Sequence, residues 1–181
     1  MHVVTVASAV VFARVLILIA TVAPREFGQL APPLAIMLGA LGVITLGLWF
    51  FSRHEPVEMP THGNPTQLKP AIGFGLLFAA VLFATAAARE FFGTQGLYAV
   101  AALSGLTDMD AITLSTAQLV HKGQLEPATG WRLILTASMS NLVFKAGVAA
   151  VLGNAQIARR TGVVFAFAFA LGAALLWLWP V

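Results

Sequence analysis

Two carboxylates, Asp108 and Asp110, stand two residues apart in the stretch SGLTDMDAITLSTA (Ser104–Ala117), inside a long apolar run. A charged group removed from water must be paired, hydrated or neutralised, because burying an isolated charge is costly. Acids in such surroundings are typical of sites that bind a cation or relay a proton. The alternative is a structural ion pair that only fixes how the helices pack.

The sequence offers two cations as partners for these acids. Asn141 and Lys145 share one polar face of the segment 131–152 with Ser138, because the three residues follow helical spacing. Arg14 stands alone in the middle of the N-terminal apolar run. Two acids and two bases balance, and a buried charge needs a partner whether it is structural or lines a hydrated path. We favour the path, in which a cation or proton changes the pairing.

The directions in which Asp108 and Asp110 point depend on whether the segment 96–120 is one continuous helix. In a continuous helix Asp108 and Asp110 would point about 200° apart. In a helix broken at Gly105, Thr107 would cap a second half-helix, with an acid three residues later as in a capping box. We favour the break, because transporters place ion sites at broken helices. The polar stripes of the continuous helix would be Ser104, Asp108 and Ser115, and Thr107, Asp110 and Thr113.

The composition identifies the solvent that these elements must satisfy. The 181 residues are 59% hydrophobic and 9% charged, with a mean hydropathy of +0.90, whereas soluble domains carry about 25% charged residues. This indicates an integral membrane protein. The absence of cysteine excludes disulfides and thiolate sites. A net charge of +3 without a basic cluster larger than Arg159-Arg160 gives no nucleic-acid footprint.

Six apolar segments predict an all-α, polytopic transmembrane helix bundle that forms a single domain over residues 1–181. Each segment is assigned as helix, because backbone groups in lipid must bond within their own segment. The loop 52–69 separates two halves, and six crossings would place both termini on one side of the membrane. The predicted helices are 3–23, 31–51, 70–90, 96–120, 131–152 and 161–179.

The first two and last two predicted helices resemble each other. ASAVVFARVLIL (Ala7–Leu18) lies over SMSNLVFKAGVA (Ser138–Ala149), which places Arg14 on Lys145. ALGVITLGLW lies over ALGAALLWLW at almost the same shift. Low-complexity sequence aligns easily by chance, but the matched cations favour a true repeat. Copies separated by four helices would share one orientation, which predicts a parallel repeat.

The run REFFGTQGLYAVAALSGLTDMDAITLSTAQLV (Arg89–Val120), followed by NLVFKAGVAAVLG and ARR, resembles a bacterial membrane domain of unknown function found C-terminal to MgtC/SapB-like domains. The resemblance covers essentially the whole chain. It implies a multi-pass protein of the bacterial inner membrane, a family often regarded as ion or metal transporters. Longer members carry further helices upstream of the first helix here, which implies that another chain supplies them or that the first repeat is incomplete.

These observations predict a cation or proton-coupled transporter or channel; the alternative is a non-catalytic scaffold or accessory subunit of a larger membrane complex. An enzyme is not expected, since no catalytic triad or nucleotide motif is present, and no cofactor is expected. The predicted partners are membrane lipid, a cation, and a second copy or another membrane subunit. If a metal ion binds, its ligands would be Asp108 and Asp110. The residues predicted to line the path are Asp108, Asp110, Thr107, Thr113, Asn141, Lys145 and Arg14.

Overall fold

The computed structural model describes residues 2–51, 72, 76, 96–152 and 155–179, and it is all-α as predicted. Four of its helices are long and apolar enough to cross a membrane, with candidate spans of 18 to 25 residues in α1, α2, α6 and α7. The predicted span 70–90 and the loop 52–69 lie outside the described residues. The helices are α1 (His2–Val22), α2 (Phe27–Phe51), α4 (Leu97–Thr107), α5 (Met109–His121), α6 (Pro127–Leu152) and α7 (Ala155–Leu178).

Three of the long helices begin before the apolar runs that predicted them. The runs gave starts at 31, 131 and 161, whereas α2, α6 and α7 start at Phe27, Pro127 and Ala155. Apolar residues mark only the part of a helix that lies in lipid, whereas the helix itself continues into polar surroundings as long as its backbone hydrogen bonds form. Proline suits the first turn of α6, because the N–H that it lacks would have no partner inside the helix.

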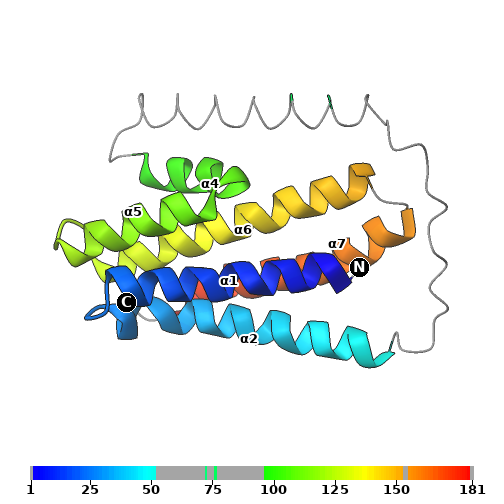
Figure 1. Ribbon diagram of the computed structural model, residues 1–181, viewed down its shortest axis with the longest axis horizontal. Coiled ribbons are helices and arrows are strands. Elements are labelled where there is room, and N and C mark those ends of the chain that lie inside the picture. Colours follow the sequence, from blue (N-terminus) through cyan, green and yellow to red (C-terminus); the bar gives the residue numbers. More distant parts are fainter. Residues whose placement is uncertain (1, 52–71, 73–75, 77–95, 153–154, 180–181) are drawn as a thin grey trace.

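The core of the bundle lies between the long helices, which run side by side along its length (Figure 1). α1, α2 and α6 contribute large side chains with essentially no exposed surface, because each of these helices packs against the other two. Lipid can replace water on the outer faces, so this inner contact depends on close packing more than on exclusion of solvent. The most buried of these side chains are Phe12, Val15, Ile19, Leu30, Leu34, Met37, Leu41, Leu133, Ile134 and Leu135.

The predicted helix 96–120 is two short helices that fold back on each other. α4 and α5 meet at Asp108, and they lie over the same half of the bundle, with the turn midway along it (Figure 1). α5 returns to the end where α6 begins: a Cβ placed on Gly130 would lie 2.6 Å from Cγ2 of Val120. We call α4 and α5 together the re-entrant hairpin. A break within this segment, which the sequence favoured, is confirmed, but it lies at Asp108 rather than at Gly105, and it reverses the chain.

This reversal changes the relation between the two ends of the chain. Arg14 pairs with Asp110 and Glu26 contacts His121, so α1 and α5 run in the same direction. Because α5 and α6 are antiparallel, α1 and α6 run in opposite directions. α1 therefore starts, and α7 ends, at opposite ends of the bundle (Figure 1). The expectations of a parallel relation and of termini on one side were wrong, because α5 turns back along the bundle where one continuous helix was predicted (Figure 1).

Candidate functional site

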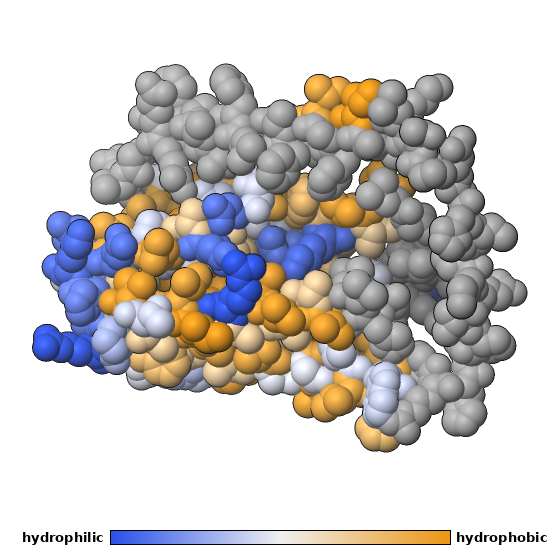
Figure 2. All heavy atoms as spheres, in the orientation of Figure 1, coloured by the Kyte–Doolittle hydropathy of each residue, from blue (hydrophilic) through white to orange (hydrophobic). Residues whose placement is uncertain are grey.

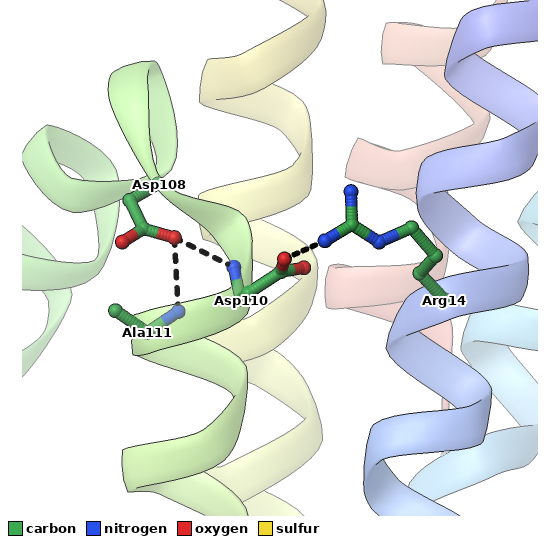
Figure 3. A network of polar contacts seen from close by, with 4 residues as sticks. All are labelled: Arg14, Asp108, Asp110 and Ala111. Carbon is green, nitrogen blue, oxygen red and sulfur yellow. Dashed lines mark hydrogen bonds and ion pairs between the residues drawn. The ribbon is translucent and has the colours of Figure 1, made fainter.

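Asp108 forms the turn of the re-entrant hairpin and caps its second helix. Its backbone is extended, with φ −139° and ψ 95°. Its N–H donates to the Ser104 carbonyl at 2.7 Å, which ends α4. Its Oδ1 accepts the backbone N–H groups of Asp110 and Ala111, each at 3.0 Å (Figure 3). These are two of the donors that the start of a helix leaves without an intrahelical partner.

The predicted capping residue, Thr107, was wrong by one position. Thr107 is the last residue of α4, and its hydroxyl donates to the Ser104 carbonyl at 3.5 Å. The reason is that α4 continues through Thr107, so the first residue with non-helical backbone is Asp108. Asp110 therefore occupies the first turn of α5, where the helix dipole favours a negative charge.

A pair of substitutions at Asp108 should separate its capping role from its charge. Asp108→Ala removes the acceptor of both N–H bonds and should lower the stability of the protein by about 0.5–2 kcal/mol. Asp108→Asn keeps an acceptor oxygen in the same place, so its free energy of unfolding should lie within about 0.5 kcal/mol of that of the parent. Thermal unfolding of the purified protein in one detergent measures both. Equal loss in the two variants would contradict the capping role.

Asp110 meets Arg14, which reaches across from the middle of α1 (Figure 3). The two side chains form an ion pair, and they remain 41% and 59% exposed on the surface of the bundle. Figure 2 shows a hydrophilic patch midway along the bundle, between α1 and α5, with hydrophobic residues around it. Asp108 is exposed as well. We call Asp108, Asp110 and Arg14 the acidic site; it carries two negative charges and one positive charge.

Asn141 and Gly105 hold the re-entrant hairpin against α6. The Asn141 amide donates from Nδ2 to the Gly105 carbonyl at 3.1 Å. The two backbones come so close that a Cβ on Gly105 would lie 2.2 Å from the carbonyl oxygen of Ala137. Only glycine fits such an approach. The sequence marked Gly105 as a break, whereas the structure uses it for contact between helices.

The structure does not gather all the predicted path residues. Lys145 lies one turn beyond Asn141 on α6, and its Nζ is buried without a hydrogen-bond partner among the described residues. The hydroxyl of Thr113 on α5 is buried and likewise unpartnered within that part of the chain. Asp110 is paired with Arg14, so the expected quartet of two acids and two bases is one ion pair, one capping acid and a separate lysine.

Sequence reasoning missed a second link between α1 and the hairpin. Nδ1 of His121, at the end of α5, lies 3.3 Å from a carboxylate oxygen of Glu26, just after α1. Nothing in the spacing could have found this contact, because the residues are 95 positions apart. Within the described ranges no three histidine, aspartate or glutamate side chains gather to hold a metal ion.

Comparison with known proteins places this arrangement in a family. Residues 1–153 match the model of a domain of unknown function, DUF4010. The chain belongs to the DUF4010 family. The match includes the acidic site, Asn141 and Lys145, so the re-entrant hairpin and its partners all fall within the family domain.

One curated relative of this DUF4010 protein supports the family assignment over most of the chain. An uncharacterized protein of Aquifex aeolicus (strain VF5) is 34% identical over 128 residues, which are 71% of this chain and 55% of the relative. The chain thus spans about half the length of that curated relative. No solved structure matches the chain. The four apolar helices and the family together describe a multi-pass membrane protein of unknown function.

Proposed function

We propose that this protein moves a cation, or couples the movement of protons, across the membrane at the acidic site. The observation that carries the proposal is the position of two carboxylates and one guanidinium at the turn of a re-entrant hairpin, midway along helices that can cross a membrane. Backbone that is not helical at this depth is tolerated only where protein buries it or where it lines a water-filled cavity.

The charges of the acidic site support a cation as the moving species. Arg14 neutralises one of the two acids, so one negative charge is left over among these three groups. Both acids lie at the surface of the bundle rather than in its core. A proton or a monovalent cation would balance the remaining charge, and intramembrane acids commonly mark such routes. Asp108 and Asp110 would then be the groups that meet the ion, and Arg14 their counter-charge.

The cellular location and an internal repeat have support of their own. The resemblance to membrane domains that accompany MgtC/SapB-like domains supports a place in the bacterial inner membrane. The matched stretches of α1 with α6 and of α2 with α7 support an internal repeat, which the helix directions would make an inverted one. Transport without a catalytic step on the solute agrees with the expectation that the protein is not an enzyme.

Flux measurements in liposomes test the proposal. The parent should carry one or more of H⁺, Na⁺, K⁺ and Mg²⁺ above protein-free liposomes, with and without a pH gradient. Asp108→Asn keeps the cap and removes only the charge, so it should lower flux without unfolding the protein. Ser115→Ala, on the exposed side of α5, is the matched control and should retain flux. Absence of flux for every ion in a folded parent would refute the proposal.

An accessory or scaffold role is the second candidate, and the exposed face of α1 favours it. Val6, Val10, Arg14 and Ile17 follow one helical stripe and are all exposed. A charged side chain in the middle of a membrane helix must be covered by protein or reached by water. Coverage by a second copy or another membrane subunit would satisfy it, with lipid around the rest of the bundle.

We therefore expect the protein to self-associate through this face. Val10→Trp should weaken the association, because it places a bulky ring in the middle of the stripe. Val43→Trp, on an exposed face of α2, should leave it unchanged. Light scattering of the purified protein in mild detergent gives the mass of the complex, and crosslinking in liposomes checks it in lipid. A monodisperse monomer in both, with full flux, would contradict self-association.

A further inference from the structure

Arg14 and Lys145, which align in the sequence match, lie on two helices that run in opposite directions. The two residues align with each other in the matched stretches of α1 and α6. α1 and α6 run in opposite directions and both pack against α5, which carries Asp110. The re-entrant hairpin therefore has one aligned cation on each of two antiparallel neighbours.

The two cations are not equivalent in this structure. Arg14 is paired with Asp110, whereas the buried Nζ of Lys145 has no partner among the described residues. A buried ammonium is costly until it finds an acceptor. Lys145 lies on the face of α6 that meets the hairpin, because Asn141, one turn before it, bonds the carbonyl of Gly105. Among the described helices that pack against α6, α5 is the one that carries acids, with Asp110 in its first turn and Asp108 as its cap.

We propose that Lys145 is the alternative counter-ion of the acidic site. In the described state Asp110 pairs with Arg14 on α1, while Asn141 and Gly105 hold the hairpin against α6. In the second state the acids of the hairpin pair with Lys145 and release Arg14, so that the acidic site becomes accessible from the opposite side of the membrane. Proteins built from inverted repeats rock around a fixed central site in this manner. The inference rests on the proposed function, since it names how the same acids would change partners during transport.

Distances between nitroxide labels test the exchange without measuring flux. The chain has no cysteine, so pairs of labelled cysteines can be added without removing any. Leu114 on α5, Ile17 on α1 and Val143 on α6 are exposed. The pair 114 and 17 reports the distance from the hairpin to α1, and the pair 114 and 143 reports its distance to α6. Measurements are made in lipid nanodiscs.

Opposite shifts in the two single-charge variants are the expected result. Arg14→Gln should lower the share of molecules with the hairpin close to α1 and Lys145→Gln should raise it, each by about threefold, the change that one ion pair of modest strength supplies. Equal distributions in both variants, or shifts in the same direction, would overturn the proposal. If Lys145→Gln does not fold, Lys145→Met replaces it: it fills similar space without a charge, so it should raise the share of molecules with the hairpin close to α1 in the same way.

The acids provide the second check. With Asp108→Asn and Asp110→Asn together, the acidic site offers neither cation a carboxylate, so Arg14→Gln should no longer move the distances. A shift of the same size would overturn the exchange. Flux decides a separate question. If the charge variants shift the label distances but the parent carries no ion, the exchange is upheld and transport is refuted. Flux with populations that ignore the charges would refute the exchange alone.

Discussion

The double variant Arg14→Gln with Asp110→Asn is expected to fold like the parent and to carry ions at the level of protein-free liposomes. The two side chains form the ion pair between α1 and α5. Neutral amides of similar size keep the polar contact but leave no charge at the first turn of α5. Replacing a pair by neutral groups is commonly tolerated, whereas removing one partner leaves the other charge alone.

The single variants make this interpretation testable. Asp110→Asn strands Arg14 in the middle of α1, and Arg14→Gln strands the acid; a lone charge at the centre of a membrane helix is unfavourable by about 2.5–3.5 kcal/mol on insertion scales. Because both side chains are partly exposed, we expect each single variant to lose about 1–3 kcal/mol, and the double variant to recover most of it. Thermal unfolding in detergent measures the cycle.

The flux of the double variant separates a structural pair from a working one. If the double variant folds and carries ions as well as the parent, the pair only holds α1 against the hairpin, and the proposed function loses its main support. Ser115→Ala lies on the same helix and keeps every charge, so its flux sets the level expected for a harmless change. A silent double variant beside an active Ser115→Ala protein is the predicted outcome.

Gly105→Ala is expected to be the most damaging replacement in the hairpin. The added Cβ would lie 2.2 Å from the carbonyl oxygen of Ala137 and 2.6 Å from its Cα. Both are backbone atoms, so no change of side chain at position 137 can make room. α4 would have to move away from α6, which would also break the bond from Asn141. We expect a loss of about 1–3 kcal/mol or more, the usual range for overpacking.

Gly147→Ala is the matched control for this prediction. It makes the same substitution within α6, where a Cβ would meet nothing within 4 Å. Its stability should equal or exceed that of the parent, because alanine suits a helix interior better than glycine by about 1 kcal/mol. Thermal unfolding of the three proteins in one detergent gives the comparison. Similar midpoints for Gly105→Ala and the parent would show that α4 and α6 do not approach as closely as described.

The sequence alone was enough to predict the four long helices and their length in a membrane. Apolar runs of membrane length are set by composition, and the backbone of such a run has no choice but to form helix in lipid. The starts of the helices were predicted less accurately, since α2, α6 and α7 begin before the apolar residues that marked them. Asp108 and Asp110 stood out because two acids in an apolar run require a reason, and a break near Gly105 was predicted from local residue types.

Only the tertiary structure decided which groups meet. The same residues, Thr107 to Asp110, could continue through the membrane or turn back, and local propensity does not distinguish the two. The close contact of Gly105 with Ala137 and the pairing of Arg14 with Asp110 fix the fold-back, and they join residues 32 and 96 positions apart. The fold-back in turn reverses α6 relative to α1. Contacts of this kind depend on backbone approach and packing in three dimensions, which spacing along the chain does not encode.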